Sequence, residues 1–462
     1  MNDKMSILLI NPPIYDFSAI DFWLRPLGML TIAGKIASQT SFEMFDFLDR
    51  SHPFLADKPQ YKSDEWGRGR FFSVKFQKPD ALKKIPRYYR RFGLPAEIFT
   101  DFLRTHKPCD FVFIQTVMTY WYLGYKEVID ELRKQWPRTK IILGGPYSFI
   151  CSEHAKSIGA DFVLTENRGD KLWDFLSIKP DGSFLPVWNV YPAPSDNSFF
   201  AGEPSNKKMV RDSILNIRRC GVETAAMKIT SGCPFKCTYC SVPIFFGGFA
   251  ARPMEEVVDE LKFLVSLGVK NIAFYDDALL YKSDEVLKPF LRYVIGNKIN
   301  VSFHTPNALN ARFIDEEIAG LMIKAGFKSF YIGFESRADE FQRKTGSKIF
   351  DNEFARAVKN LIAAGADKSG ITVYLMLGHP RFEIQDVEES MKFVNSLGVR
   401  IMLADFSPIP GTPDGRLAEK YVDMNEPLMH NKTAFPIILF GDEKVTFIKD
   451  MCRKLNGGIR GL

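Results

Sequence analysis

Three cysteines lie close together near the middle of the chain. Cys233, Cys237 and Cys240 fall within eight residues, after a short apolar run at residues 225–230. A 4Fe-4S cluster is held by cysteine thiolates and takes four ligands, so three thiols leave one iron open for a small molecule. A zinc site or three buried thiols are the alternatives. Zinc motifs usually pair two short Cys/His segments, and no second segment lies near this one.

The spacing Cys-x3-Cys-x2-Cys resembles the signature of the radical S-adenosylmethionine (SAM) superfamily. Tyr239 stands before the last cysteine, where that family usually has an aromatic residue, and is a candidate for SAM contact and for catalysis. The resemblance implies that the three cysteines hold the cluster and that the open iron chelates SAM. An electron from the cluster would then cleave SAM to a 5'-deoxyadenosyl radical, with a reductase such as flavodoxin or ferredoxin as the electron source.

Composition limits the remaining classes. A length of 462 residues predicts two or three domains, because single cores rarely exceed about 250 to 300 residues. The net charge of +6 from 61 basic and 55 acidic residues does not favour nucleic acid, which needs a concentrated basic face. The other four cysteines are scattered, which is typical of a reducing cytosol. No apolar run approaches the roughly 20 residues that span a bilayer, so we expect a soluble, cytoplasmic protein without a membrane span.

The N-terminal part alternates short apolar strands with helices. Strands are expected at 6–10, 42–46, 110–116, 140–143 and 162–164, and helices at 26–37 and 125–135. This alternation predicts a doubly wound parallel α/β sheet, in which ligands bind beyond the carboxyl ends of the strands. The candidate cofactor contacts in those loops are Asn11, Thr116, Met118, Thr119, Tyr120, Gly144, Gly145 and Glu166.

The same part resembles the cobalamin-binding, Rossmann-like domain that precedes many radical SAM barrels. The shared features are Asn-Pro-Pro at 11–13, Pro-Leu-Gly at 26–28 and Gly-Gly-Pro at 144–146, whereas Glu-Asn-Arg-Gly-Asp at 166–170 departs from that family's Gly-Glu-Gly-Glu-like loop. The Asp-x-His-x-x-Gly motif that gives cobalt an axial histidine in other cobalamin proteins is absent. The resemblance thus implies cobalamin without that ligand. A sheet that binds nothing is the alternative, and the aromatic residues 120–122 either face a corrin ring or belong to the core.

The domain boundaries follow from composition. We place the first domain at 1–185, with an insertion at about 51–106 rich in Lys, Arg and aromatic residues. Such a run either binds RNA or an anionic ligand, or forms a solvated surface, and we favour the surface. Residues 186–221 have many Pro, Ser and Gly and little periodicity, which predicts a linker. A second domain at 222–415 and a C-terminal extension at 416–462 complete the chain.

Six strand-like segments recur in the second domain, at 225–230, 271–275, 300–304, 329–333, 372–377 and 400–404. The helical segments 254–267, 314–325, 354–364 and 386–397 are followed by Gly268, Gly326, Gly365 and Gly398, which predicts a glycine cap for each helix. Six units are too few for a closed eight-stranded barrel. They match the partial (β/α)6 barrel of the radical SAM family.

Functional groups in parallel barrels lie at the carboxyl ends of the strands. By resemblance, Asp276 or Asp277 after the second strand, and Glu335 with Ser336 after the fourth, contact the ammonium and ribose groups of SAM. The alternatives are turn capping for the Asp pair and a structural ion pair for Glu335. His379, in a Gly-His-Pro turn after the fifth strand, is a candidate hydrogen-bond donor or proton acceptor in catalysis. A packed histidine is the alternative, and the same two readings hold for a histidine after the third strand.

If both domains act, the resemblance implies a C-methyltransferase. The deoxyadenosyl radical would remove hydrogen from an unreactive carbon of a small molecule or metabolite, and that carbon would take methyl from methylcobalamin. The barrel alone would also support cyclisation, rearrangement or C–C bond formation. An RNA methylthiotransferase is a weaker alternative, because those proteins carry three more cysteines in the first domain and only Cys109 and Cys151 lie there. A non-enzymatic cobalamin or redox module would not need the Glu335 and Asp276 carboxylates.

Overall fold

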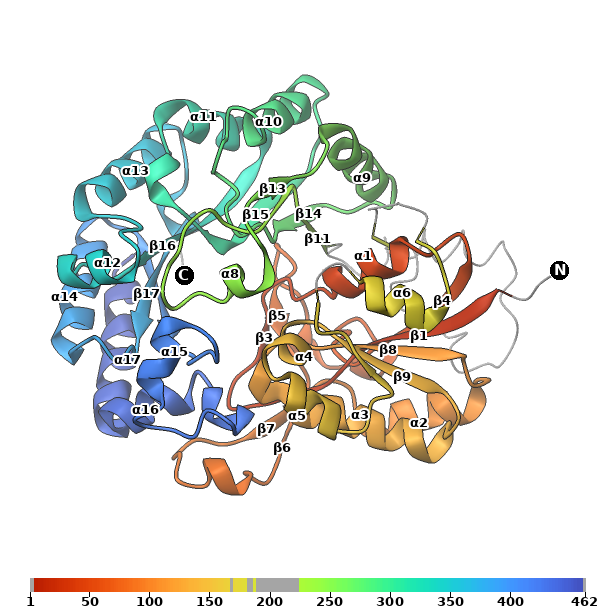
Figure 1. Ribbon diagram of the computed structural model, residues 1–462. Helices are drawn as coiled ribbons and strands as arrows, with labels where there is room; N and C mark the ends of the chain where they lie inside the picture. Colours follow the sequence, from red (N-terminus) through yellow and green to blue (C-terminus); the bar gives the residue numbers. More distant parts are fainter. Residues whose placement is uncertain (1–3, 167–168, 181–185, 188–223, 460–462) are drawn as a thin grey trace. The chain divides into compact units, whose positions relative to one another are not determined.

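The structure is a computed structural model in which residues 4–166, 169–180, 186–187 and 224–459 are described (Figure 1). These residues divide into two compact units, one formed mostly by the N-terminal part of the chain and the other mostly by the residues from 224 onward. The predicted linker at 186–221 lies outside the described residues except for its first two positions. Each unit is therefore described separately.

The N-terminal unit contains a five-stranded sheet whose order is β10-β9-β8-β1-β4. All four neighbouring pairs are parallel. Figure 1 shows α1 (Leu27–Gly34) and α6 (Asp170–Leu176) on one face of the sheet, and α2 (Ala96–Thr105) and α3 (Tyr122–Gln135) on the other. The predicted doubly wound α/β fold is confirmed. The strands are β1 (Met5–Asn11), β4 (Thr40–Asp46), β8 (Phe111–Gln115), β9 (Lys140–Gly144) and β10 (Phe162–Val163).

The strand order creates a switch point between β1 and β8. The chain runs from β1 outward to β4, then returns past β1 to β8 and continues in the opposite direction to β9 and β10. In open parallel sheets the loops that diverge at such a point leave a crevice for a ligand. The loops after β1 and β8, which begin at Asn11 and Thr116, therefore flank the position where this fold class binds its ligands.

The segment predicted as an insertion, at about 51–106, ends in the helix α2. In α2, three apolar side chains, Phe99, Phe102 and Leu103, are buried in the core of the unit. The preceding segment instead forms short antiparallel strands, β6 (Ser73–Lys75) and β7 (Arg90–Phe92), of which β7 also pairs with β2 (Ile14–Asp16). The helix itself was not predicted, although its apolar residues Phe99, Phe102 and Leu103 have helical spacing.

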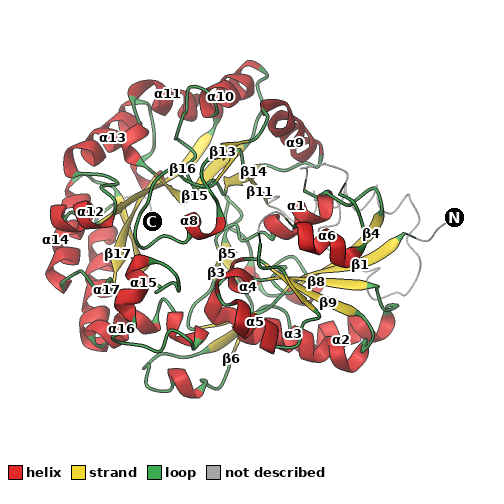
Figure 2. Cartoon of the chain, viewed as in Figure 1, coloured by secondary structure: helices red, strands yellow, loops and turns green. Residues whose placement is uncertain are grey.

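The C-terminal unit contains a six-stranded sheet in simple chain order, β11-β14-β15-β16-β17-β18, with every neighbouring pair parallel. In Figure 2 the helices that follow the strands lie around the outside of the curved sheet. This arrangement confirms the predicted six-unit partial barrel. The strands are β11 (Thr224–Met227), β14 (Asn271–Phe274), β15 (Ser302–Leu309), β16 (Phe327–Glu335), β17 (Ile371–Leu377) and β18 (Arg400–Asp405).

Helices between the strands end as the glycine pattern predicted. The four glycines after the predicted helices have left-handed φ angles of 88°, 102°, 104° and 72°, a conformation that costs glycine least. The helices concerned are α9 (Met254–Ser266), α11 (Glu316–Ala325), α13 (Asp351–Ala363) and α14 (Ile384–Ser396). Two further helices, α10 (Leu287–Gly296) and α12 (Asp339–Thr345), were not predicted.

The C-terminal extension covers the last strand of the barrel. Helix α17 (Asp442–Gly457) contacts β18, and the Asn456 side chain accepts from the Ile401 amide and donates to the Ile401 carbonyl at 2.9 and 2.8 Å. An edge strand has unpaired backbone groups, and these two bonds satisfy the amide and carbonyl of Ile401 on β18. None of the described helices is long and apolar enough to cross a membrane.

Candidate active site

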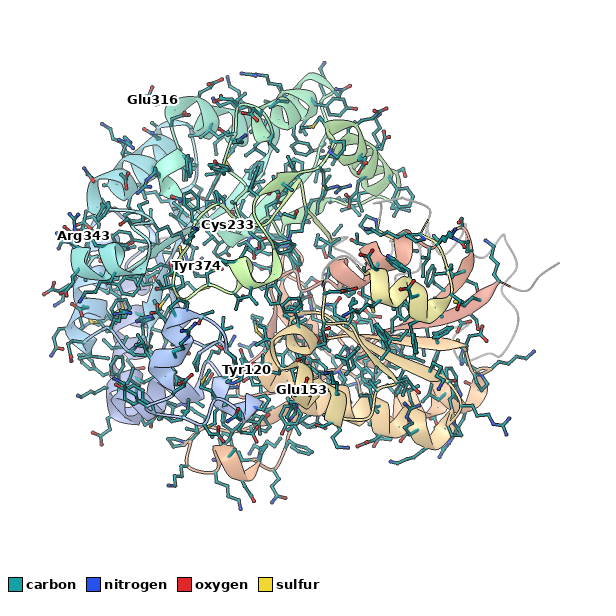
Figure 3. All side chains as sticks on the ribbon, viewed as in Figure 1. Tyr120, Glu153, Cys233, Glu316, Arg343 and Tyr374 are labelled. Atoms are coloured by element: carbon teal, nitrogen blue, oxygen red, sulfur yellow. The ribbon has the colours of Figure 1, made fainter. Side chains whose placement is uncertain are left out.

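The cysteine loop connects β12 (Thr230–Ser231) to the short helix α8 (Val242–Phe245). Cys233, which is labelled in Figure 3, and Cys237 and Cys240 are all half-buried. Burial raises the pKa of each thiol, that of Cys240 to about 11. Because a thiol binds metal only after it has lost its proton, metal binding would displace the protons of these cysteines.

The donor chemistry of this loop fits an iron-sulfur cluster. Among the described residues, no three His, Cys, Asp or Glu side chains are gathered as a single metal ion would require. In a 4Fe-4S cluster each thiolate binds a different iron, so the ligands stand farther apart than around one ion. The site residues that would hold the cluster are Cys233, Cys237 and Cys240.

Two carboxylates hold the segment that leads into the loop. The Asp276 Oδ1 atom accepts from the amides of Ile229 and Thr230 at 3.0 and 2.5 Å and from the Thr230 hydroxyl at 2.7 Å. Asp277 Oδ2 accepts from the Gly232 amide at 3.1 Å and from Lys228 Nζ at 3.3 Å. Both residues were predicted to contact SAM. In the structure their bonds fix the backbone before Cys233.

Asp276 is buried, and its Oδ2 atom has no hydrogen-bond partner among the described residues. Burial raises the pKa of this carboxyl to about 6, although its hydrogen bonds to Thr230 oppose the shift. The second oxygen therefore remains the one part of Asp276 that still has hydrogen-bonding capacity.

A glycine is required where the loop begins. Gly232 has a φ angle of 70°, and a Cβ atom there would lie 2.0 Å from the Gly248 carbonyl oxygen. This contact and the antiparallel pairing of β12 with β13 (Ala250–Ala251) close the loop on itself. This close approach could not be predicted from the sequence, because Gly232 and Gly248 are far apart in the loop.

Glu335 ends β16 and forms a buried ion pair with Lys348. Its Oε1 atom lies 3.0 Å from Lys348 Nζ, and the two side chains are 10% and 16% exposed. Burial favours the neutral amine, but the charges of Glu335, Cys237 and Cys240 outweigh it and raise the pKa of Lys348. Lys348 is thus the cation that pairs with Glu335. Sequence reasoning missed it because a lysine after a Thr-Gly-Ser turn is typical of an exposed surface.

Glu335 adopts a φ angle of 64° where the register between β16 and β17 shifts. A non-glycine residue in this region carries backbone strain, which is common at functional sites. Gly333 makes room for the pair, since a Cβ there would lie 2.5 Å from Lys348 Nζ. The neighbouring Ser336 is buried, and its hydroxyl accepts from the Ala338 amide at 3.1 Å. Ser336 therefore serves the turn that follows the strand.

Tyr239 belongs to the cysteine loop and packs against Phe341. Its ring stacks on Phe341 with a centroid separation of 6.3 Å, and its hydroxyl hydrogen-bonds with Cys237. Burial, the nearby Glu335 charge and the thiolates raise the pKa of Tyr239 well above its usual value. The hydroxyl therefore stays protonated and supports Cys237 as a neutral partner.

The structure does not favour proton transfer by His379, which was predicted as a catalytic candidate. The side chain is fully buried, its Nε2 lies 3.0 Å from Asp414 Oδ2, and its Nδ1 accepts from the Arg381 amide at 3.1 Å. With both ring nitrogens engaged, no nitrogen is left for a substrate. His304 is likewise buried, with its nitrogens 2.9 Å from Ser329 Oγ and from Asn271 Oδ1.

The predicted cofactor contacts of the N-terminal unit fall into a buried and an accessible group. Tyr120 is 1% exposed and lies in the hydrophobic core, so its side chain has no surface for a corrin ring. Thr119 is also buried, and Thr116 bonds to the Gly144 carbonyl, while Asn11 donates to Asp46 at 2.8 Å. In the structure the contacts of these residues lie within the unit, where they support the loops from inside.

The accessible group lies on the loops after β8 and β9. Met118 is 38% exposed, Gly144 is half-buried and Gly145 is exposed. Gly145 has a φ angle of 120°, and a Cβ there would lie 2.0 Å from the Thr116 carbonyl oxygen. This glycine lets the two loops touch beside the switch point. Glu166 accepts from the Lys171 amide at 2.9 Å and so caps the start of α6, and its neighbours 167 and 168 lie outside the described residues.

The six-unit parallel sheet and the three-cysteine loop together define the class of radical SAM barrels. The radical SAM superfamily matches residues 227–394. This part of the chain therefore matches the radical SAM superfamily, and the cluster and SAM are the cofactors that this family implies.

Individual relatives match part of the chain. An uncharacterised methyltransferase of Pyrococcus horikoshii is 27% identical over 197 residues, which cover 42% of this chain and 41% of that protein. A ribosomal-protein methylthiotransferase, RimO, of Phocaeicola vulgatus is 30% identical over 181 residues, which cover 37% of this chain and 41% of that protein. The chain thus spans about two fifths of the length of these curated relatives.

A solved structure resembles almost the whole chain. TsrM, a radical SAM methyltransferase from Kitasatospora setae solved with cobalamin and a 4Fe-4S cluster, has a TM-score of 0.62 at 15% identity and covers 97% of this chain and 91% of its own. At this identity the likeness concerns the fold. It includes the N-terminal sheet as well as the barrel.

Proposed function

We propose that this radical SAM enzyme is a cobalamin-dependent methyltransferase that acts on an unactivated carbon of a small molecule. The observation that carries the proposal is the presence, in one chain, of a three-cysteine barrel and a parallel sheet with the order β10-β9-β8-β1-β4, whose switch point lies between β1 and β8. Such a point is where sheets of this order take their ligands. The likeness to TsrM over both parts supports the combination.

The residues near the cysteine loop suit the charges of SAM. The methionine end of SAM has an ammonium group and a carboxylate. The Glu335 and Lys348 pair offers a negative and a positive side chain, one for each of these groups. We assign Glu335 to the ammonium and Lys348 to the carboxylate. When bound, the cluster supplies the electron that cleaves SAM.

The N-terminal loops suit a large planar ligand that needs no histidine. The loops after β1, β8 and β9 contain no histidine at positions 11–13, 116–122 or 144–146. The exposed surface there comes from Met118 and from the backbone at Gly144 and Gly145. We propose that these positions cover one face of cobalamin without providing a cobalt ligand.

A second candidate, methylthiotransferase, is favoured by the likeness to RimO. The N-terminal part of the chain speaks against it, because only two cysteines, Cys109 and Cys151, lie at positions 1–185. A second three-cysteine cluster would need one more thiol there.

The test is anaerobic purification, reconstitution with iron, sulfide and cobalamin, and analysis of the products of SAM. We expect an iron-sulfur absorption band, bound cobalamin, and both 5'-deoxyadenosine and S-adenosylhomocysteine. Cys237→Ala should abolish 5'-deoxyadenosine. If wild-type protein forms 5'-deoxyadenosine but neither binds cobalamin nor forms S-adenosylhomocysteine, the enzyme is a cobalamin-independent radical enzyme and the methyltransferase proposal fails.

A further inference from the structure

The second half of the cysteine loop is tied to one buried carboxylate, Asp414. Thr238, between Cys237 and Cys240, donates from its hydroxyl to Asp414 Oδ2 at 2.5 Å. The Asp414 amide in turn donates to the Thr238 carbonyl at 3.2 Å. The two residues are 176 positions apart in the chain, so this reciprocal pair joins the loop to the segment after the last strand.

The local structure fixes Asp414 in place. It lies in the first turn of α15 (Pro413–Ala418) and is fully buried. The Thr412 hydroxyl caps the helix by accepting from the Gly415 amide at 2.9 Å. Gly415 is needed there, because a Cβ would lie 2.0 Å from the Ile409 carbonyl oxygen. A short, well-capped turn therefore holds the carboxylate against the loop.

Two further donors complete the surroundings of Asp414. Besides Thr238, its Oδ2 atom accepts from His379 Nε2 at 3.0 Å, and Arg381 Nε lies 3.4 Å from Oδ1. Although burial favours the protonated acid, the bonds from His379 and Thr238 lower the pKa of Asp414 below its usual value. Since His379 Nδ1 accepts from the Arg381 amide, a neutral imidazole carries its proton on Nε2 and points it at Asp414.

We propose that Asp414 is a positioning residue for the cluster loop, acting through Thr238 to set the spacing of Cys237 and Cys240, with His379 as the buried donor that orients it. The proposal rests on the proposed radical SAM chemistry of this loop. His379 then acts on Asp414 and has no direct contact with the reacting atoms. Charge-assisted hydrogen bonds to a buried carboxylate are among the stronger ones in proteins.

The test compares Thr238→Val, which removes the donor, with Thr238→Ser, which keeps it. Each protein is reconstituted anaerobically under identical conditions. Iron per chain is measured, and the electron paramagnetic resonance spectrum of the dithionite-reduced cluster is recorded as SAM is added. We expect Thr238→Val to need about tenfold more SAM for half of the spectral change, the factor that one hydrogen bond to a charged group commonly provides. Thr238→Ser should stay close to wild type.

Two further variants separate positioning from general loss of stability. Asp414→Asn keeps the side-chain volume but cannot accept from all three donors, so it should show the same spectral defect that we expect for Thr238→Val. It takes the place of Thr238→Val in the test if the valine variant does not fold. Asp405→Asn removes a half-buried carboxylate elsewhere in the barrel, which pairs with Lys449 at 2.6 Å, and should leave the spectrum unchanged. Wild-type spectra in both Thr238→Val and Asp414→Asn, or equal defects in Thr238→Ser and Thr238→Val, would overturn the proposal. A wild-type protein that takes up no iron would overturn the proposed function itself.

Discussion

Removal of Lys348 should destabilise the C-terminal unit far more than removal of an ordinary surface lysine. The side chain is 16% exposed and lies 3.0 Å from Glu335, which is 10% exposed. In Lys348→Met, the Glu335 carboxylate stays buried without its cation. Breaking a buried ion pair in this way costs about 3 to 5 kcal/mol.

The assay is urea unfolding of metal-free, reduced protein followed by far-ultraviolet circular dichroism. All six tryptophans precede residue 189, so tryptophan fluorescence follows the N-terminal part separately. Lys348→Met and Glu335→Gln should each lower the free energy of unfolding by several kcal/mol. The double variant should lose clearly less than the two single losses together, because neither charge then remains buried alone.

The matched control is Lys262→Met on α9, whose partner is Asp259 at 3.4 Å. Both side chains of that pair are more than half exposed. Exposed pairs contribute only about 0.2 to 1 kcal/mol. A loss in Lys348→Met no larger than this control, or additive losses in the double variant, would refute the reasoning that the pair is a coupled, desolvated unit.

Three other outcomes follow from the geometry of the two units. Gly232→Ala should lower iron uptake and reduce the free energy of unfolding by at least about 2 kcal/mol, because it combines a left-handed φ with a backbone collision. Gly320→Ala, with nothing within 4 Å of the new Cβ, should instead raise the free energy of unfolding by about 0.5 to 1 kcal/mol. Equal iron content and stability in the two variants would contradict this prediction. The buried Asp276 carboxyl has a pKa of about 6 against 3.8 in the unfolded chain, so the folded state binds more protons, and stability is lost as pH rises from about 4 to 6. That shift corresponds to about 3 kcal/mol, and the advantage of Asp276→Asn over wild type should grow across this range in urea titrations, while a pH-independent difference would count against it. Gly145→Ala should weaken cobalamin binding, followed by absorbance titration, since the new Cβ would force apart the loops after β8 and β9; unchanged affinity would place the ligand elsewhere.

Features encoded by neighbouring residues were accessible from the sequence alone. The three cysteines fall in one short loop, so their spacing indicated the chemistry before any fold was known. The alternation of apolar strands with helices predicted both sheets, and glycines at helix ends predicted the left-handed caps, because each of these signals depends on local backbone geometry. The helices α2, α10 and α12 were not predicted, although the apolar residues of α2 and α10 lie on one face of each helix.

The partners of the cysteine loop were decided only by the tertiary structure. Asp276 reaches Thr230 across 46 positions and Asp414 reaches Thr238 across 176. Strand order and register brought each pair together, and no periodic pattern in the chain relates such distant positions. For the same reason the sequence could name Glu335 and His379 as polar residues at strand ends, but only packing determined that Lys348 neutralises the first and Asp414 engages the second.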